Sequence, residues 1–358
     1  MKILISISSF CLLLATLGCE RAPEESAEFR LNFQSDDIEK YAQVDTVRAF
    51  EFPIEHGPHE DFRNEWWYLT SLLKTQDGRE FGAQFTIFRQ ALAPNIDSKS
   101  EWRTGQIYMA HFAISDIADS SHQSFERFSR GHQRIAGVKT APFRAFMDDW
   151  ELMSTGDSFS PLNLRVKEGE FALSANLSMT KPTIFHGDQG LSRKGPVNFS
   201  YYYSIPRMYT EGTLTTPEGE FEVTGNSWLD REWMSALLSD EHLGWVWFTL
   251  QLHDGSDLVF FWLRSKNAEN QEKGVGLEIA LNGQKRSLED HEWSAKSVRY
   301  WREWPVEWRL KVGDQELLIK PAFDDQLMKT GIQYWEGVVF VMEGSERIGE
   351  GYLELTGY

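Results

Sequence analysis

The chain contains 358 residues with a formal net charge of −18 at pH 7, and 41% of its residues are hydrophobic. This length suits one large domain or two domains of ordinary size. Binding to nucleic-acid phosphates requires a cationic surface, which so acidic a chain does not supply, so the composition excludes a nucleic-acid partner. The 14 Trp and 24 Phe residues can build a large core or line an apolar cavity.

Residues 1–19 have the pattern of an export signal. A Lys at the second position is followed by an apolar run and then by Gly18-Cys19. The run is too short to remain as a membrane-spanning helix. It resembles a bacterial lipoprotein signal, in which Cys19 becomes the lipidated first residue of the mature chain; an ordinary signal peptide with an incidental Cys19 is the alternative. Glu20 stands where an Asp would favour the inner membrane, so we expect a lipid anchor in the outer membrane, facing the periplasm.

The rest of the chain divides into three parts. Residues 20–45 are polar and acidic without periodicity, which predicts a flexible tether. We assign an N-terminal domain to residues 46–225 and a C-terminal domain to residues 226–358. Cys11 is the only other cysteine and leaves with the signal, so the mature chain forms no internal disulfide and depends on its core.

Short strands separated by turns are predicted throughout both domains. In the first half, residues 65–73 and 80–90 flank an Asp-Gly turn and predict a hairpin, with a third strand at 107–117. In the second half, residues 244–252 and 257–265 flank another Asp-Gly turn, and a Trp pair and a Phe-rich return strand recur. The repeated layout predicts an internal duplication. Many short antiparallel strands predict an all-β fold of the sandwich or barrel type.

Several motifs occur together in a fixed order from about residue 50 to the end of the chain. They include FPIEHGPHEDFRNEWWYLTSLL, YMAHFAISDI, FERFSRG, WLDREWMS, GWVWFTLQLHDG and GYLELTGY. This set resembles the AttH and carotenoid 1,2-hydratase-like family. The resemblance implies two consecutive lipocalin-like antiparallel β-barrels and a lipoprotein of a type often encoded beside ABC-transporter permeases. Some distant relatives in that family are hydratases that act on isolated double bonds of isoprenoids.

One strand departs from the family pattern. Phe261 and Trp262 stand where the carotenoid hydratases carry a tyrosine and an aspartate. The hydratase activity therefore does not follow from the resemblance alone.

Glu65 is the first candidate for acid catalysis, because it lies in the sequence beside three large aromatic residues. A carboxylate in such a setting is either hydrogen-bonded or poised in an apolar site. The alternative is an ion pair with Arg89 or Arg63 that joins neighbouring strands.

Strand alternation gives the first candidate ligand-binding residues. Trp67 shares a strand face with Glu65, and Gln84 is a polar residue between large apolar neighbours on the return strand. An apolar wall with a few hydrogen-bonding groups is typical of a barrel interior that holds a ligand.

Two further positions could contact a ligand. His111 lies in the middle of a strand, where it is either a ligand contact or a core histidine with satisfied hydrogen bonds. Arg127, in FERFSRG, could bind a carboxylate or phosphate head group, or form a salt-bridged bend. His56 and His59 have a loose spacing on a loop that does not favour a zinc site, and we expect no metal.

The segment SWLDREWMS supplies a second candidate acid. Asp230 and Glu232 flank Arg231, and Trp233 follows. Such a pair can keep one carboxyl group protonated, able to protonate a C=C bond beside indole rings that stabilise a carbocation. The alternative is a structural clamp in which Arg231 bridges both acids.

Trp245, Trp247 and Gln251 lie on one face of the predicted strand 244–252, and that face is amphipathic. The opposite face is uniformly apolar. We therefore expect the first face to contact a ligand.

Three functions remain open from the sequence. The first is binding of an apolar small molecule, a lipid or an isoprenoid, in association with an ABC export permease. The second is a hydratase or isomerase that protonates a C=C bond, and the third is a structural adaptor with filled barrels. The sequence has no GxSxG motif and no Gly-rich cofactor loop, which excludes a serine hydrolase of that type, and we expect no cofactor.

Overall fold

Antiparallel strands make up most of the described chain, which comprises residues 38–93, 104–195, 198–267 and 274–358 of a computed structural model. All of these described residues belong to one compact unit. The predicted all-β fold is confirmed. The predicted signal with Cys19, and the tether up to residue 37, lie outside the described residues. Within the described ranges, no helix has the length and apolarity needed to cross a membrane.

The described chain begins with a segment that packs against the first sheet. It holds two short 3-10 helices, η1 (Ile38–Lys40) and η2 (Ile54–His56). Tyr41 and Val44 are buried, and the Tyr41 hydroxyl donates to the carbonyl oxygen of Ala91 at 3.1 Å. The last residues of the expected tether are therefore folded.

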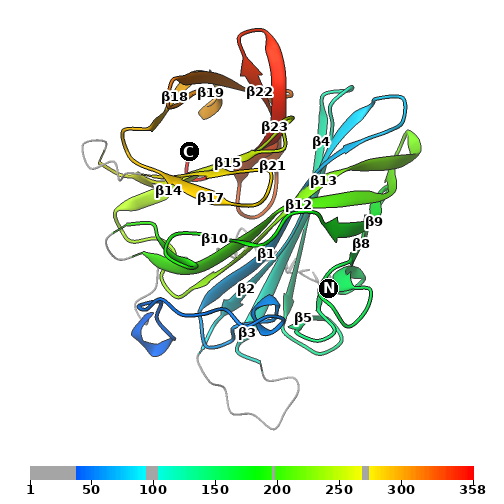
Figure 1. Ribbon diagram of the computed structural model, residues 1–358. Helices are drawn as coiled ribbons and strands as arrows, with labels where there is room; N and C mark the ends of the chain where they lie inside the picture. The colour runs from blue at the N-terminus through cyan, green and yellow to red at the C-terminus, as the bar shows by residue number, and fades with distance from the viewer. Residues whose placement is uncertain (1–37, 94–103, 196–197, 268–273) are drawn as a thin grey trace, which may run out of the picture. The chain divides into compact units, whose positions relative to one another are not determined.

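The first sheet contains thirteen strands among the described residues, in the spatial order β4-β3-β2-β1-β13-β12-β9-β8-β7-β6-β5, with β10 and β11 paired to β12 (Figure 1). Their bounds are β1 (Asn64–Lys74), β2 (Glu80–Ala91), β3 (Gln106–Asp116), β4 (Ser121–Arg130), β5 (Ala136–Lys139), β6 (Arg144–Met147), β7 (Trp150–Ser154), β8 (Leu162–Glu168), β9 (Phe171–Met179), β10 (Ile184–Phe185), β11 (Leu191–Arg193), β12 (Phe199–Thr216) and β13 (Gly219–Met234).

The second sheet contains ten strands in the described ranges, in the order β17-β16-β15-β14-β23-β22-β20-β19-β18, with β21 paired to β22. Their bounds are β14 (His242–Leu252), β15 (Asp257–Ser265), β16 (Val275–Ile279), β17 (Lys285–Leu288), β18 (Trp293–Trp301), β19 (Trp304–Val312), β20 (Gln315–Pro321), β21 (Leu327–Met328), β22 (Tyr334–Glu343) and β23 (Glu346–Leu355).

Both sheets share one connectivity around their first hairpin. In each, the first strand pairs with the second and also with the last, as β1 does with β2 and β13, and β14 with β15 and β23. Gly78 and Gly255 close the two hairpin turns with φ of 90° and 89°, a conformation that favours glycine. The chain passes between the sheets from Met234 to His242, so residues 226–234 belong to the first sheet.

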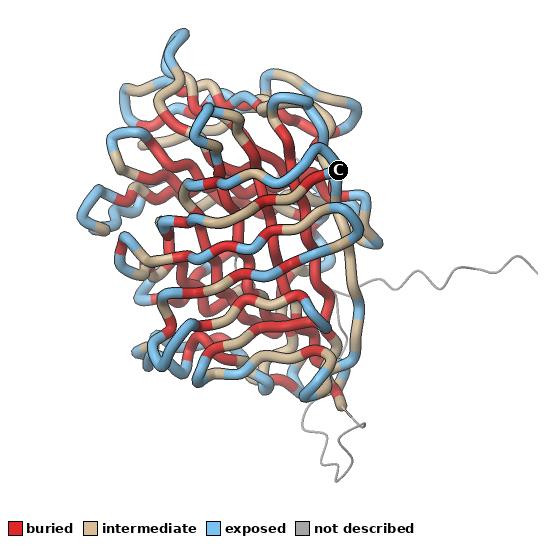
Figure 2. Tube along the Cα trace, turned by 90° about the vertical axis from the view of Figure 1, so that its right-hand side faces the viewer, coloured by how far each residue is buried: buried red, intermediate tan, exposed pale blue. Residues whose placement is uncertain are grey.

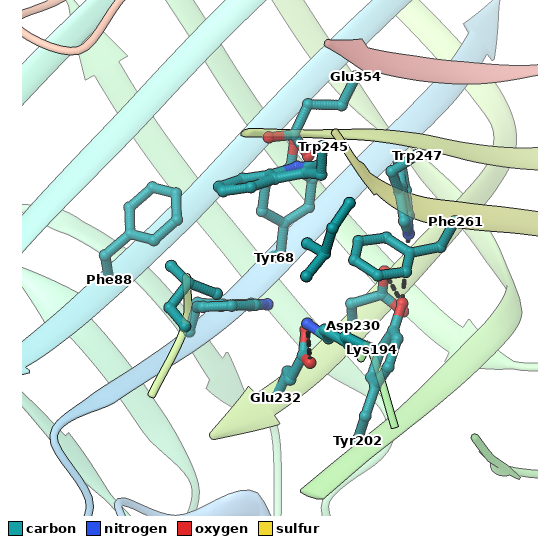
Figure 3. A pocket seen from close by; sticks show the side chains of 13 residues that line it. Tyr68, Phe88, Lys194, Tyr202, Asp230, Glu232, Trp245, Trp247, Phe261 and Glu354 are labelled. Atoms are coloured by element: carbon teal, nitrogen blue, oxygen red, sulfur yellow. Dashed lines mark hydrogen bonds and ion pairs between the residues drawn. The ribbon is translucent and has the colours of Figure 1, made fainter. Parts of the chain in front are cut away.

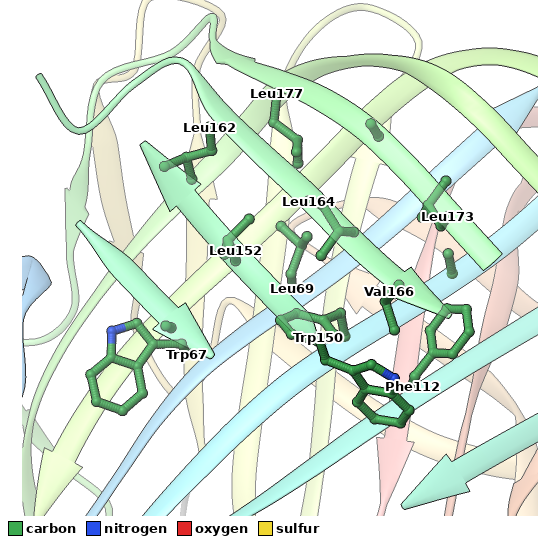
Figure 4. Close-up of a cluster of buried hydrophobic side chains, with 14 of the residues drawn as sticks. Trp67, Leu69, Phe112, Trp150, Leu152, Leu162, Leu164, Val166, Leu173 and Leu177 are labelled. Carbon is green, nitrogen blue, oxygen red and sulfur yellow. The ribbon is translucent and has the colours of Figure 1, made fainter. Parts of the chain in front are cut away.

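Each curled sheet fills its own interior with apolar side chains. Trp67, Leu69 and Phe112 belong to the core of the first sheet, together with leucines of β7, β8 and β9 (Figure 4). A separate core fills the second sheet and includes Phe248 and Leu353. Figure 2 shows buried residues running through the strands and exposed residues gathered at the turns. The position of Gln84 in the sequence predicted an apolar ligand inside the first barrel. Apolar side chains of the core already occupy that space.

Candidate active site

The faces of the two sheets that point away from their cores meet around a cavity of about 60 Å³, measured as the space open to the centre of a water molecule. A single water needs roughly 10–15 Å³ by that measure, so the cavity accommodates several waters or the reacting end of a larger molecule. The lining residues come from both sheets and from the segments between their strands (Figure 3): Trp66, Tyr68, Phe88, Lys194, Tyr202, Asp230, Glu232, Leu237, Trp245, Trp247, Phe261, Leu263 and Glu354.

Strand alternation explains why these side chains meet. On β1, Trp67 points into the first core while its neighbour Tyr68 lines the cavity. On β23, Leu353 and Leu355 lie in the second core, and Glu354 between them faces the cavity. The same strands therefore build the cores with one face and the site with the other.

Asp230 is buried and held by three hydrogen-bond donors. Oδ1 accepts from the Trp228 indole at 2.7 Å and from the Ser204 hydroxyl, and Oδ2 accepts from the Tyr202 hydroxyl at 2.9 Å. Burial raises the pKa of Asp230 to about 7, although these hydrogen bonds act in the opposite direction, and the charge of Glu232 raises it further. Asp230 therefore changes protonation near neutral pH.

Glu354 is a second buried carboxyl group, on the opposite sheet (Figure 3). Burial raises the pKa of Glu354 to about 8. Hydrogen bonds with Tyr68 and Trp245 lower this pKa, and the charge of Asp230 raises it. The Tyr68 hydroxyl donates its proton to Glu336, which does not line the cavity and whose pKa burial raises well above its usual range.

Glu232 differs from the other two acids because it forms an ion pair with Lys194. The Lys194 ammonium also lies 4.8 Å from the ring centre of Phe261 and 5.6 Å from that of Trp66. Cation–π contacts of this kind help to hold an ammonium group in an apolar site.

Aromatic rings form most of the wall. Trp247 donates its indole N–H to the Tyr202 hydroxyl at 3.3 Å, which ties β14 of the second sheet to β12 of the first. Trp66, Phe88 and Trp245 are the half-buried lining residues, so they mark the side on which the cavity opens.

Comparisons with known proteins identify the family to which this architecture belongs. The family model described as AttH-like matches residues 43–358. The chain belongs to the AttH-like family. No curated protein sequence matches this AttH-like chain.

Solved structures give the same result at the level of the fold. An AttH protein from Nitrosomonas europaea is 34% identical with a TM-score of 0.80, over 88% of this chain and 99% of that chain. Kievitone hydratase from Nectria haematococca is 14% identical with a TM-score of 0.68, over 89% of this chain and 96% of that chain. CghA with Sch210972 is 12% identical with a TM-score of 0.55, over 91% and 96%. The last two show a shared fold alone.

Four of the residues proposed from the sequence line the cavity of this AttH-like protein: Asp230, Glu232, Trp245 and Trp247. The alternative in which Arg231 clamps both acids is wrong, because successive residues of β13 point to opposite faces. The Arg231 side chain lies on the face away from the cavity and pairs with Glu65 instead.

Glu65 lies outside the cavity lining, in a buried ion cluster. It accepts from Arg89 Nε at 3.0 Å and from Arg231 at 2.7 Å, and His59 Nδ1 is 2.6 Å away. Burial alone would raise the pKa of Glu65, but the charges of Arg231, His59 and Arg89 outweigh it and hold the pKa well below its usual range. Glu65 therefore remains ionised, which fits the ion-pair alternative and not a proton donor.

Trp67 and Trp233 also lie away from the cavity. Trp67 packs in the first core and donates to the His56 carbonyl oxygen at 2.9 Å. Trp233 is fully buried and stacks on His59 at 3.8 Å. Both indoles support the ion cluster around Glu65.

Gln84 and His111 lie between the sheets, but beyond the cavity. Gln84 donates to the Thr86 hydroxyl at 2.7 Å. His111 is fully buried, with Tyr334 at 2.7 Å and Glu126 at 3.0 Å. This environment matches the core-histidine alternative.

Arg127 and Gln251 have structural partners as well. Arg127 forms salt bridges with Asp149 at 2.5 Å and Glu168 at 2.8 Å, on the rim of the first sheet. Gln251 donates to the Pro206 carbonyl oxygen at 2.7 Å, which fixes β14 against the first sheet.

Sequence reasoning missed Lys194, Tyr202 and Glu354. Glu354 lies in the GYLELTGY motif between two core leucines, so alternation alone would have placed it on the other face. Tyr202 is the middle residue of a run of three tyrosines, and Lys194 follows a three-residue strand; neither position carries a pattern in the sequence that points to a site.

Proposed function

We propose that this AttH-like protein is a hydratase-type enzyme that adds water across a C=C bond of an apolar substrate. One observation carries the proposal: two buried carboxyl groups with raised pKa values, Asp230 and Glu354, line one aromatic cavity from opposite sheets. Two titratable groups can act as an acid and a base when their environments keep one of them protonated and the other ionised. The fold shared with a hydratase adds support at the level of architecture only.

Glu354 is the proton donor in this mechanism, because burial raises its pKa and favours its neutral form, whereas three hydrogen-bond donors favour the carboxylate form of Asp230. Its proton passes to one alkene carbon as the π bond breaks, which leaves a carbocation on the other carbon. The indole rings of Trp245 and Trp247 line the same cavity, where an indole face can stabilise the positive charge.

Asp230 accepts a proton from the attacking water. The three donors that hold Asp230 stabilise its carboxylate and fix its orientation. Water forms the new C–O bond and gives one proton to Asp230, so the substrate gains one hydrogen and one hydroxyl group. Without water, the same two groups would add a proton at one carbon and remove one from another, which is an isomerisation.

Binding of an apolar molecule without chemistry is the second candidate. The Lys194 and Glu232 charges are paired with each other, and three hydrogen-bond donors hold Asp230, so an apolar ligand in the cavity would not separate these groups from their partners. We also propose, from the sequence alone, that Cys19 carries a lipid anchor to the outer membrane and that the protein works beside an ABC export permease.

The test is incubation of the purified protein with a panel of isoprenoids and prenylated phenols in oxygen-labelled water, followed by mass spectrometry. Hydration predicts a product heavier by one labelled water. Asp230→Asn and Glu354→Gln should each reduce the rate by about 10²–10⁴-fold, the usual contribution of a positioned acid or base.

Glu350→Gln is the matched control, since Glu350 lies on the same strand near the surface and should leave the rate unchanged. Panel members that quench tryptophan fluorescence but are recovered unchanged would favour binding alone. If no member is bound or converted, the proposal is wrong for this substrate class.

A further inference from the structure

The second sheet has a larger cavity of its own, lined by residues of β15, β18 and β19 and called the second cavity below. Its volume is about 630 Å³, measured as the space open to the centre of a water molecule, and sites for small molecules usually have about 300–1,000 Å³. Strand alternation separates it from the candidate active site. On β15, Phe261 and Leu263 line the cavity between the sheets, whereas Trp262 and Arg264 line the second cavity.

The sequence of β18 explains why this space is not filled. β17 and β18 are the two ends of the described sheet and do not pair with each other. The Trp293 indole reaches across to β16, where a Cβ atom at Gly276 would lie 2.9 Å from its Nε1. The next residues that alternation places on the same face as Trp293 are Ala295 and Ser297. Their small side chains leave the second cavity open beside the tryptophan.

Aromatic rings form the apolar part of the wall. The ring centre of Trp262 lies 5.4 Å from that of Trp308 and 6.1 Å from that of Trp293. The ring of Tyr358, another lining residue, lies 3.3 Å from the guanidinium carbon of Arg264. An apolar molecule in this space would therefore contact several ring faces and one cation.

Arg264 is a half-buried cation that is fixed in place. Its Nη1 donates to the carbonyl oxygen of Thr356 at 3.0 Å and to that of Gly357. Burial lowers the pKa of the Arg264 guanidinium, and the hydroxyl groups of Tyr358 and Tyr300 raise it. No described carboxylate is among the groups that raise this pKa.

Other charged residues of the second sheet show how unusual this is. Arg286 and Arg299 each form salt bridges with two carboxylates. Lys296 and Asp290 also border the second cavity, but both are exposed, so water and salt screen their charges. The half-buried charge of Arg264 thus remains without an anionic partner among the described residues, and an anionic ligand would supply one.

We propose that the second cavity binds an apolar carboxylate, a molecule with one carboxylate group on an aromatic or aliphatic body. The carboxylate would accept hydrogen bonds from Arg264, since the planar guanidinium matches carboxylate geometry. The body would pack against Trp262, Trp293 and Trp308. This proposal concerns binding alone, at a site apart from Asp230 and Glu354, and does not depend on the proposed function.

Calorimetric titration of the purified protein with decanoate and with decanol tests the proposal. The two molecules have the same chain, but only decanoate carries a charge at pH 7.5. Decanoate should bind the wild type at least about tenfold more tightly, the usual effect of a hydrogen bond to a charged group. Equal affinities, or no binding of decanoate, would overturn the proposal.

Arg264→Gln should remove the preference for decanoate over decanol, because it replaces the charge by a neutral amide. Lys320→Gln is the matched control, since Lys320 is an exposed cation on β20 that does not line the second cavity. The control should keep the wild-type preference. A preference that survives in Arg264→Gln would assign the carboxylate to another place and refute the site.

Ala295→Phe should fill the second cavity and abolish binding of both molecules while Arg264 stays in place. Together with the wild-type comparison, it decides the question even if circular dichroism shows that Arg264→Gln does not fold. Phe88→Ala alters the opening of the cavity between the sheets and should leave the affinity for decanoate unchanged. Loss of decanoate binding in Phe88→Ala, with binding retained in Ala295→Phe, would place the ligand in the other cavity and overturn the proposal.

Discussion

Asp230 on β13 and Glu354 on β23 belong to different sheets, yet their carboxyl groups line the same cavity. Burial raises the pKa of Asp230 to about 7 and that of Glu354 to about 8, and the charge on Asp230 contributes to the latter. Neutral pH therefore favours one ionised and one protonated group at the site.

The proposed mechanism predicts a bell-shaped dependence of kcat on pH. The rate should rise as Asp230 ionises near pH 7 and fall as Glu354 loses its proton near pH 8. Initial rates measured in buffers of constant ionic strength check this. A rate that stays constant through both values would contradict the assignment of acid and base.

Asp230→Asn should change how stability depends on pH. Between the ordinary value of 3.8 and about 7, folded Asp230 holds a proton that the unfolded chain has released. Its contribution to the free energy of unfolding therefore falls as the pH rises through this window. The variant should gain stability relative to the wild type from about pH 4 to pH 7, as measured by urea unfolding.

The exposed Asp240 is the control for this experiment, since Asp240→Asn should show no such trend. A difference between Asp230→Asn and wild type that is the same at every pH would mean that Asp230 ionises as readily as in the unfolded chain.

Glu65→Gln should destabilise the fold. Any loss of turnover in this variant should result from that lower stability. The substitution leaves Arg89 and Arg231 buried beside a neutral amide, and loss of one partner of a buried pair costs about 3–5 kcal/mol. The drop in the free energy of unfolding can be read from urea titration. A variant with wild-type stability and no turnover would instead place Glu65 in the mechanism.

Replacing both Lys194 and Glu232 should cost less stability than replacing Lys194 alone. Lys194→Met leaves Glu232 unpaired in a buried site and should cost about 3–5 kcal/mol. The double variant with Glu232→Leu should recover most of that loss, because apolar side chains can replace a buried ion pair. Equal losses in the single and double variants would show that the ion pair itself stabilises the protein.

Cys19→Ser should release the protein from membranes if the proposed lipid anchor exists. Cell fractionation with an antibody to the chain, and mass spectrometry of the N-terminus, measure this directly. Unmodified Cys19, or a variant that remains in the membrane fraction, would exclude anchoring through this residue.

Alternation of residues in the sequence was enough to predict the all-β fold and four of the side chains at the cavity. The face of β14 with Trp245 and Trp247 lines the cavity, as expected, and its other face packs in a core. Asp230 and Glu232 lie at the cavity because β13 continues the first sheet past residue 225. These features follow from the two-residue period with which side chains alternate along a strand, and this period can be read from the sequence.

The location of the site depended on how two sheets pack, and no local pattern contains that information. A polar residue such as Gln84 has the same alternation whether its strand face lines a barrel or meets another sheet. The neutral state of Glu354 likewise depends on burial by residues more than a hundred positions away, such as Trp247. The ion cluster at Glu65 needed Arg231, which is 166 residues distant in sequence.

The separation of cores from cavity bears on how this fold could acquire new substrates. Every wall residue on β1, β13, β14 and β23 alternates with residues that hold a sheet together. Evolution, or a designed library, can therefore vary every second position of four strands while the hydrophobic interiors stay intact. The interiors of the two sheets and the wall of the cavity are thus built from different positions of the same strands.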